Sequence, residues 1–379
     1  MAERISPERL AQIVDDGEAT IVDTRPEESF EAWHVPGAVN YPFGKEEALD
    51  GHLDALERLV EDGRDLVTIC GKGISSVNLA DQLAEATDAV TVYAVEDGME
   101  GWSRVYEEVP VDVGGDVAVV QVQRRAKGCL SYLVGCGETG AAAVVDPTDD
   151  VETLRGAADR AELSVEAVID THVHADHVSG GRRLADELDV PYYLGARASG
   201  RDLTFSFEGL ERNAVLDVGQ IELKALASPG HTTEMISVLV EDRALLTADT
   251  LHVDSVGRTE LEFGEEGGET GSRLLYETLH RTLLAEPEGL CVLPGHVTVT
   301  PDGHFAVGEP GEPISTTVRA ARTELEVLSL EEDAFVDRLA DAGEKPANFE
   351  EIIEINRGVR EVDDDERTEL ELGPNNCTA

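Results

Sequence analysis

The sequence predicts an α/β chain of two domains: an N-terminal parallel sheet covered by helices, and a C-terminal sandwich of sheets with helices outside. The 379 residues suffice for two ordinary domains, each with its own buried core. Strand-like and helix-like stretches alternate over the first third of the chain, which is typical of a parallel sheet. From about residue 117, strand-like runs follow one another closely, and this pattern favours packed sheets.

The first domain is expected over residues 1–112. Ser6 followed by Pro7 predicts a helix start, because serine caps the first turn and proline fits the first helical position; this helix should run to about residue 14. Short apolar runs predict strands, and helical patterns fill the stretches between them. The strands are expected at residues 19–23, 66–69 and 89–94, and the helices at residues 52–60 and 77–85. Gly114 and Gly115 are interpreted as a linker.

The second domain is expected over residues 117–379. Its strands are predicted at residues 119–122, 130–134, 142–145, 165–169, 191–194, 221–226, 236–240, 244–246 and 290–293. Its helices are predicted near residues 151–161, 182–188 and 273–284. The acidic run at residues 363–366 is interpreted as an exposed loop.

The charge balance is unusual. Asp and Glu total 79 against 30 Lys and Arg, which gives a formal net charge of -49 spread over both halves of the chain. Such a charge repels itself unless concentrated salt screens it, with a Debye length of about 3 Å at 1 M. We therefore predict a halophilic protein, with a binder of basic partners as the alternative. No cationic patch is visible, so nucleic acid is not an expected partner.

No segment predicts export or membrane insertion. Apolar runs are shorter than the ~20 residues that span a bilayer, and the first ten residues carry charges without an apolar stretch. The cysteines follow no regular spacing, which indicates free thiols in a reducing compartment. They are Cys70, Cys129, Cys136, Cys291 and Cys377. We expect a soluble, cytoplasmic protein.

One cysteine stands in a glycine-rich turn. Cys70 directly follows a predicted strand and opens the run Cys-Gly-Lys-Gly-Ile-Ser-Ser before a predicted helix. The glycines let successive backbone N–H groups point inward at a helix N-terminus, which makes an anion-binding cup. Such a cup lowers the pKa of a thiol and can hold a persulfide. A buried structural cysteine is the plainer alternative.

Blocks on either side of this loop resemble rhodanese domains. They are Ile-Val-Asp-Thr-Arg at 21–25, His-Val-Pro-Gly-Ala-Val-Asn at 34–40 and Asp-Gly-Met-Glu-Gly-Trp at 97–102. The resemblance covers about residues 5–108 and implies a rhodanese α/β parallel-sheet domain in which Cys70 carries the transferred sulfur. The loop often carries arginines in that family, whereas Lys72 is its only cation here, so a regulatory or sulfur-carrier role is an alternative. The residues of the blocks are expected to be scaffold: Asp23, Arg25, His34 and Trp102.

A histidine-rich loop is the most specific signal in the chain. His172 and His174 are two apart on a segment that leaves a predicted strand, so both side chains can face one ion. Further histidines and aspartates close other strands downstream. The seven candidate ligands are His172, His174, Asp176, His177, His231, Asp249 and His296. Imidazole and carboxylate are ligands of zinc and iron, and burying such groups without an ion would be costly.

This pattern resembles the metallo-β-lactamase superfamily over about residues 117–379, and within it the persulfide dioxygenases. The stretches that carry the closer resemblance are residues 248–251, 257–261, 345–349 and 373–377. The resemblance implies an αββα sandwich and one Fe(2+) per chain, held by His172, His231 and Asp249. Two imidazoles and one carboxylate leave positions for O₂ and a substrate. His174 would then stand beside the site as an outer group or a longer ligand.

A hydrolase of the glyoxalase II type is the alternative, because all seven of its metal ligands are present. His172, His174 and His231 would form one site. Asp176, His177 and His296 would form the second, with Asp249 bridging two Zn(2+) that generate hydroxide for thioester hydrolysis. The ligands alone leave both interpretations open. The fused rhodanese-like domain and residues 257–261 and 346–348 favour the dioxygenase.

The expected reaction oxidises a low-molecular-weight thiol persulfide, similar to glutathione persulfide, with O₂ to sulfite and thiol, coupled to a sulfurtransferase. Arg258 could pair with a substrate carboxylate, and a structural ion pair is its alternative role. A sulfur carrier or sensor with a vestigial metal site is a third hypothesis. The oligomeric state is left open, with a homodimer as one option. The remaining groups are expected in packing or surface roles: Cys129, Cys136, Cys291, His52, His252, His280 and His304.

Overall fold

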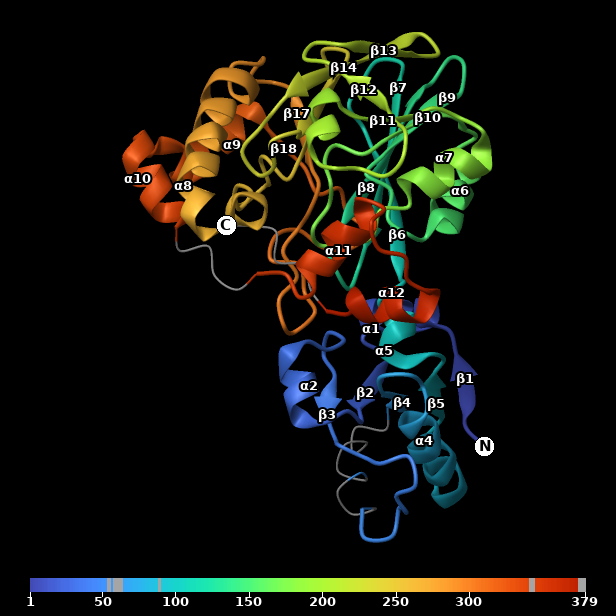
Figure 1. The fold of residues 1–379 in the computed structure, drawn as a ribbon. Coiled ribbons are helices and arrows are strands. Elements are labelled where there is room, and N and C mark those ends of the chain that lie inside the picture. Colours follow the sequence, from blue (N-terminus) through green and yellow to red (C-terminus); the bar gives the residue numbers. More distant parts are fainter. Residues whose placement is uncertain (53–55, 57–63, 88–89, 341–344, 374–379) are drawn as a thin grey trace.

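Two domains lie end to end in the computed structural model (Figure 1). It describes all residues except 53–55, 57–63, 88–89, 341–344 and 374–379. The predicted fold class is confirmed: a parallel-sheet domain precedes a larger domain of two sheets with helices. Most of the helix predicted at 52–60, the start of the strand predicted at 89–94, and Cys377 lie outside the described residues.

The N-terminal sheet contains five strands in the order β1-β5-β4-β2-β3, all paired in parallel. The strands are β1 (Glu3–Ile5), β2 (Ala19–Asp23), β3 (Val39–Asn40), β4 (Asp65–Ile69) and β5 (Val92–Val95). The helices are α1 (Pro7–Asp16), α2 (Glu27–Ala32), α4 (Ser75–Ala86) and α5 (Gly98–Trp102). The Ser6 hydroxyl accepts from the Arg9 N–H, which confirms the predicted start of α1. The short elements β1, α2 and β3 were not predicted, because they are too short to show a periodicity.

The first sheet of the larger domain contains seven strands, in the order β12-β11-β10-β9-β8-β7-β6. They are β6 (Tyr106–Val111), β7 (Val117–Arg124), β8 (Leu130–Cys136), β9 (Ala141–Val145), β10 (Ser164–Ile169), β11 (Tyr192–Gly195) and β12 (Glu208–Leu210). Gly114 and Gly115 have φ of 74° and 71° and turn the chain from β6 into antiparallel β7. These glycines therefore form a hairpin turn rather than the predicted linker, and β6, expected in the first domain, begins the second domain's sheet.

The second sheet of this domain contains six strands, in the order β13 to β18. They are β13 (Val215–Val218), β14 (Ile221–Ala227), β15 (Ile236–Val240), β16 (Ala244–Ala248), β17 (Cys291–Pro294) and β18 (Thr316–Thr317). Buried side chains from both sheets, such as Tyr132 and Leu246, form one core cluster between them. Leu154 of α6 (Val151–Arg160) and Leu184 of α7 (Gly181–Leu188) pack on the outer face of the first sheet. Leu275 of α8 (Glu260–Thr278) belongs to the cluster outside the second.

The C-terminal helices differ most from the prediction. α8 begins at Glu260 rather than near residue 273, because glycines interrupt its helical pattern and Gly264 leaves helical geometry with φ 69° and ψ 172°. The acidic run predicted as a loop opens α12 (Asp364–Leu370). The Asp363 side chain caps this helix by accepting from the Glu366 N–H. Acidic residues in the first turn also stabilise the helix, because they interact favourably with the positive end of its dipole. The other helices here are α9 (Val318–Glu324), α10 (Glu332–Leu339) and α11 (Phe349–Asn356).

α12 lies between the two domains (Figure 1). Glu369 on this helix accepts from Lys72 of the N-terminal domain at 2.8 Å. Glu371, just after it, accepts from the buried Arg124 guanidinium of β7 at 2.9 Å and from the Val178 N–H beside the histidine-rich loop. One short segment thus contacts both domains and the loop that carries candidate ligands.

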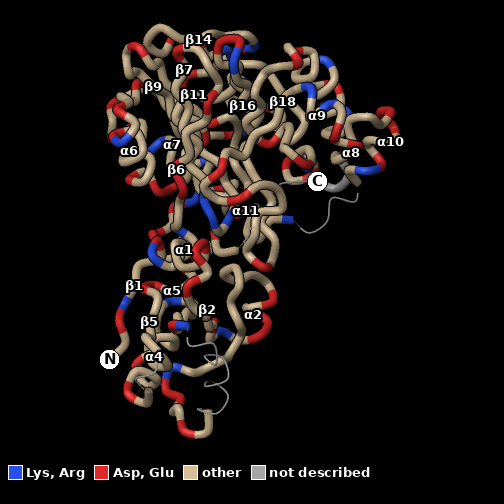
Figure 2. Tube along the Cα trace, turned by 180° about the vertical axis from the view of Figure 1, so that it is seen from behind, with Lys and Arg blue, Asp and Glu red and all other residues tan. Residues whose placement is uncertain are grey.

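Acidic residues occur along both domains (Figure 2). The net charge of -49 is therefore distributed over both domains, and electrostatic self-repulsion acts on each of them. Among the described helices, none combines the length and the apolar character that a membrane crossing requires.

We predict that Glu371→Gln lowers the free energy of unfolding by about 3 kcal/mol, because it leaves the buried Arg124 unpaired. Burial opposes ionisation of Glu371, but Arg124 and Lys127 lower its pKa below the ordinary value of 4.5. The loss should therefore be complete above pH 4.5 and shrink as the pH falls through the depressed pKa. Denaturant unfolding in molar salt measures it, with Glu369→Gln, on the exposed side of the same helix, as the control. Equal stability of wild type and Glu371→Gln at pH 7 would contradict it.

Candidate functional site

The candidate ligands gather where strands of the two sheets end. His172 follows β10, His231 follows β14 and Asp249 directly follows β16. Ala248 has a φ of 45°, a conformation that non-glycine residues rarely adopt, and it turns the chain so that Asp249 leaves the strand. Gly257 lies so close that a Cβ there would be 1.8 Å from the Asp249 carbonyl oxygen. The site is therefore built on rigid, closely packed strand ends.

Three of the predicted ligands converge on one point. The Asp249 Oδ2 atom lies 3.8 Å from His172 Nε2 and 3.6 Å from His231 Nε2. All three side chains are at most 1% exposed, and the three atoms have no hydrogen-bond partner. Unpartnered buried polar atoms are costly, so their convergence indicates a place for a cation. We call His172, His231 and Asp249 the triad.

The outer ring atoms of the two triad histidines are held by hydrogen bonds. His231 Nδ1 donates to the Arg258 carbonyl oxygen at 2.7 Å, and His172 Nδ1 lies 2.9 Å from the Thr171 hydroxyl. Burial lowers the pKa of both histidines, and it takes that of His172 well below its ordinary value. Neutral imidazoles with fixed Nδ1 atoms present Nε2 lone pairs, which is the form that binds a metal.

His174 does not join the triad. Its Nε2 atom lies 3.2 Å from Asp146 Oδ1 and 3.9 Å from Asp170 Oδ1. Burial disfavours the imidazolium, but Asp146 and Asp170 raise the pKa of His174 above its ordinary value. His174 was predicted as an outer group or a longer ligand, or as a ligand of the first metal in the hydrolase alternative, and its side chain is instead turned toward a separate acidic pair.

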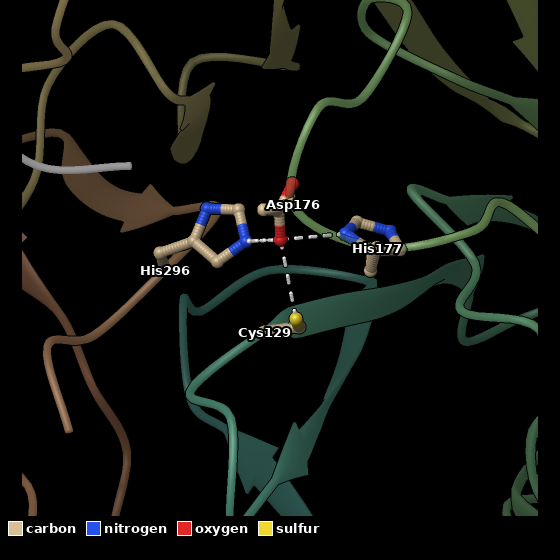
Figure 3. Close-up of side chains that lie close together, drawn as sticks. All are labelled: Cys129, Asp176, His177 and His296. Carbon is tan, nitrogen blue, oxygen red and sulfur yellow. Dashed lines mark hydrogen bonds and ion pairs between the residues drawn. The ribbon is translucent and has the colours of Figure 1, made fainter. Parts of the chain in front are cut away.

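A second cluster gathers around one carboxylate oxygen (Figure 3). Asp176 Oδ2 accepts from His177 Nδ1 and from His296 Nε2, both at 2.8 Å. The Cys129 thiol donates to the same oxygen at 3.5 Å. All four side chains are buried. We call Cys129, Asp176, His177 and His296 the thiol cluster.

Asp249 connects the triad to the thiol cluster. While Oδ2 faces the triad histidines, Oδ1 accepts from His296 Nδ1 at 2.5 Å. Burial opposes ionisation of Asp249, but His296 and His252 hold its pKa well below the ordinary range. The Asp249 carboxylate is therefore ionised and held in one orientation, with Oδ2 facing the triad histidines and Oδ1 facing His296 of the thiol cluster.

Sequence reasoning missed two residues of this centre. Cys129 was predicted as a core cysteine and His252 as a surface or packing residue. His252 is buried, and its Nε2 atom lies 3.7 Å from Asp249 Oδ1. Its position three residues after Asp249 was a usable signal, whereas Cys129 precedes an apolar strand and its partners are remote in sequence.

Side chains at the C-terminal ends of α11 and α12 brace the histidine-rich loop. The buried Asn356 amide donates to the carbonyl oxygens of His174 and His177, at 2.9 and 2.8 Å. Its side-chain oxygen accepts from the Ser179 N–H, and Glu371 accepts from the Val178 N–H. The loop conformation that sets the ligand positions thus depends on residues of the C-terminal helices.

Cys70 lies in the other domain, between β4 and α4, with 4% of its surface exposed. The Ser76 hydroxyl donates to its sulfur at 3.2 Å. Burial raises the pKa of the thiol, but hydrogen bonds from Ser75 and Ser76 outweigh this effect and lower it overall. Gly98 is required beside the loop, since a Cβ there would lie 2.0 Å from the Cys70 carbonyl oxygen. Lys72 is paired with Glu369 and also with Glu100 at 2.9 Å.

The residues expected to be scaffold of the N-terminal domain are mostly buried. Arg25 donates to the Asp23 carboxylate at 2.7 Å, and Trp102 is 1% exposed. Arg258, the candidate for a substrate carboxylate, is itself 1% exposed, and its Nε atom donates to Glu260 Oε1 at 2.6 Å. A substrate carboxylate at Arg258 would have to share the guanidinium with Glu260.

Family models match both parts of the chain. A model described as "Rhodanese-like domain" matches residues 6–105, and one described as "Metallo-beta-lactamase superfamily" matches residues 124–296. These matches agree with the resemblances of the two halves and with the order of the two folds.

The similar proteins include hydroxyacylglutathione hydrolases and persulfide dioxygenases. The chain is 30% identical over 198 residues to a hydroxyacylglutathione hydrolase of Polaromonas sp., covering 50% of this chain and 70% of that protein. It is 27% identical over 187 residues to the mitochondrial persulfide dioxygenase ETHE1 of Homo sapiens, covering 48% of this chain and 69% of that protein. The crystal structure of ETHE1 from Myxococcus xanthus matches with a TM-score of 0.54 and 24% identity, over 63% of this chain and 97% of that chain. This structural match shows the fold alone.

We predict that Ser76→Ala raises the pKa of Cys70, because it removes a hydrogen bond that stabilises the thiolate. A smaller thiolate fraction should slow alkylation of Cys70 severalfold at pH 7, with the difference vanishing at high pH where both thiols are ionised. Mass spectrometry of the alkylated peptides measures the rate, and the half-buried Cys291 in the same protein is the internal control. Unchanged Cys70 kinetics across the pH range would show that Ser76 does not act on the sulfur.

Proposed function

Because the chain belongs to the metallo-β-lactamase superfamily and carries a rhodanese-like domain, we propose that it is a persulfide dioxygenase fused to a sulfurtransferase. Its substrate would be a low-molecular-weight thiol persulfide, oxidised with O₂ to sulfite and thiol. The persulfide dioxygenases among the similar proteins support this class, and the hydroxyacylglutathione hydrolases support a rival class. The choice between them therefore depends on the geometry of the ligands.

The observation that carries the proposal is the division among the histidines. His172, His231 and Asp249 present unpartnered atoms to one another. The ring nitrogens of His174 also lack a hydrogen-bond partner, but its Nε2 atom lies 3.2 Å from Asp146 Oδ1 rather than at the triad. A hydrolase site with three histidines on the first metal would need His174 turned inward. Two imidazoles and one carboxylate are instead the donor set of nonheme Fe(2+) oxygenases. Iron held there would supply positions where O₂ and a sulfur anion can bind side by side.

The chain's own residues have defined tasks in this proposal. The Arg258 carbonyl fixes the tautomer of His231, and Thr171 does the same for His172. His296 holds Asp249 so that its Oδ2 atom faces the triad. The Arg258 guanidinium would bind a carboxylate of the thiol substrate while it keeps its hydrogen bond to Glu260. Such fixed groups pre-organise a site before the substrate arrives.

The two-zinc thioester hydrolase remains the second candidate. One observation favours it: Asp176, His177 and His296 lie together beside Asp249, where a second metal of a hydrolase would bind. In that case two Zn(2+) would generate the attacking hydroxide. Metal content and substrate preference separate the two candidates.

The N-terminal domain would transfer the sulfane sulfur of the persulfide substrate. Cys70, in its hydrogen-bonded loop, would accept or deliver sulfane sulfur, for example by combining sulfite with persulfide sulfur as thiosulfate. Fusion raises the effective concentration of one site near the other. We further propose a cytoplasmic protein adapted to high salt, because its net charge of -49 needs screening.

For the metal, we predict about one iron per chain after anaerobic purification, with oxygen uptake when glutathione persulfide is added in molar salt. His172→Ala should lose the iron, because it removes a triad donor. His174→Gln should keep about one iron per chain, because His174 is paired with Asp146 rather than with the triad. Elemental analysis and an oxygen electrode measure both. Two zinc ions per chain, no oxygen uptake and rapid thioester hydrolysis would establish the rival instead.

For the division of labour, we predict that Cys70→Ala abolishes sulfur transfer and leaves oxygen uptake largely intact, because Cys70 belongs to the separate N-terminal domain. Thiosulfate formation from sulfite and persulfide is the transfer assay, and the oxygen electrode reports on the metal domain. Cys291→Ser, in the metal domain and distant in sequence from both loops, is the matched control. Parallel loss of both activities in Cys70→Ala would refute the division.

A further inference from the structure

A cavity of about 350 Å³ opens beside the ends of β11, β12 and β14, against the C-terminal part of α8. We propose that it binds a small organic anion, a molecule with one carboxylate or sulfonate group on an apolar body. Small-molecule sites measure about 300–1,000 Å³, so the volume suits such a ligand. None of the described residues that line the cavity is one of the seven candidate metal ligands. The inference therefore holds whether the triad binds iron or zinc.

The inner wall of the cavity is apolar. Leu210, Met235 and Ile236 contribute buried side chains, and Leu274 of α8 contributes a half-buried one. Ala227, the last residue of β14, has only a methyl side chain, which leaves space between them. Such walls favour a ligand that can remove hydrocarbon or aromatic surface from water.

The charged groups at the mouth of the cavity are mainly guanidinia. Arg197, Arg212 and Arg281 line it with exposed side chains, together with Glu211 and Glu277. Glu277 Oε1 lies 3.0 Å from Arg281 Nη1, so these two charges offset each other. In the part of the chain that the structure describes, Arg197 and Arg212 have no ion-pair partner, and neither has Glu211. Two cationic groups against one carboxylate are therefore left to meet a ligand.

Unpaired guanidinia are unexpected in this protein. Asp and Glu outnumber Lys and Arg by 79 to 30, and most arginines that the structure describes are paired with a carboxylate. Arg197 and Arg212 follow different strands, β11 and β12, yet line the same cavity. A guanidinium presents a planar fork of N–H donors that matches two oxygens of a carboxylate or sulfonate. The mouth of the cavity thus supplies the charge, and the inner wall the apolar surface, that an organic anion requires.

One further carboxylate lines the cavity without opposing an anion. Glu234 is buried, and Arg201 Nη1 donates to its two oxygens at 2.7 and 2.6 Å. A cation at this distance compensates the negative charge of Glu234. The repulsion that an incoming anion meets therefore comes mainly from Glu211 and Glu277 at the mouth.

The cavity lies against the segment that carries His231. Pro229 and Met235, on either side of His231 in the chain, both line it. The Thr278 hydroxyl of α8 donates to the Pro229 carbonyl oxygen at 2.6 Å, and the Thr250 hydroxyl donates to the Met235 sulfur at 3.0 Å. A bound anion would therefore contact this segment on both sides of His231, while His231 itself does not line the cavity.

The test is equilibrium dialysis of the full chain against 2-naphthoate in 1 M KCl. Wild type should bind about one molecule per chain. It should bind the uncharged 2-naphthamide at least about fivefold more weakly, because the amide cannot pair with the guanidinia. The Debye length in this buffer is about 3 Å, so mainly guanidinia in direct contact with the ligand contribute. Acetate, which has the carboxylate without the apolar body, should not displace 2-naphthoate at equal concentration.

The double variant Arg197→Gln, Arg212→Gln should bind 2-naphthoate at least about fivefold more weakly and 2-naphthamide as wild type does. Leu274→Glu should weaken binding of both, because it places a carboxylate in the apolar wall. Arg155→Gln, which changes an exposed arginine of α6, is the matched control and should leave both affinities unchanged. Circular dichroism checks that the variants fold, and the double variant alone decides the matter if Leu274→Glu does not.

His172→Ala separates this cavity from the metal centre. It should bind 2-naphthoate as wild type does, since His172 belongs to the triad and does not line the cavity. The proposal is overturned if wild type binds no 2-naphthoate, if it binds the acid and the amide equally, or if the double variant keeps wild-type affinity. Loss of binding in His172→Ala would place the ligand at the triad and would also overturn it. Dialysis does not depend on iron or oxygen uptake, so failure of the dioxygenase proposal would be seen separately.

Discussion

The orientation of one buried carboxylate organises the metal domain. Asp249 offers Oδ2 to the two triad histidines and Oδ1 to His296, and it is 0% exposed. An ionised carboxylate that is buried away from water needs a polar or cationic partner at each oxygen. The groups around Asp249 are therefore polar ones that can interact with its negative charge. The strained turn at Ala248 and the absence of a side chain at Gly257 are local consequences of fitting that carboxylate between two sheets.

The segment at α12 contacts the N-terminal domain and also the histidine-rich loop of the metal domain. Glu371 pairs with Arg124 and accepts from the N–H of Val178. Glu369, two residues earlier, accepts from Lys72 in the loop that follows Cys70. The loop of Cys70 and the histidine-rich loop are therefore both tied to α12. Exposed ion pairs such as the one at Lys72 contribute little stability, whereas the buried pair at Glu371 fixes where α12 lies.

The sequence predicted the two folds, their order and most strands, because apolar runs and strand ends are local patterns. It also named all three members of the triad as candidate ligands, because several histidines and aspartates recur at successive strand ends, and the structure brings these three together; their binding of a metal stays a prediction. It could not show that His174 faces Asp146 or that Cys129 joins a polar cluster, because those outcomes depend on packing between elements distant in sequence. The start of α8 was missed because its glycines hide the helical period, and the capped acidic start of α12 was mistaken for a solvated loop.

The dependence of the histidine-rich loop on Glu371 has a consequence for how the protein is made. Glu371 lies 193 residues beyond Val178, the loop residue whose amide it accepts. At ribosomal speeds of about 5–20 residues per second, roughly 10 to 40 s separate the emergence of the two. During that interval strands β11 to β18 and the remaining candidate ligands are added, and the histidine-rich loop lacks its contact with Glu371 until the end of it. The braced conformation of the histidine-rich loop can therefore form only after Glu371 has left the ribosome, so we expect metal binding at the triad to be completed late in synthesis or after it.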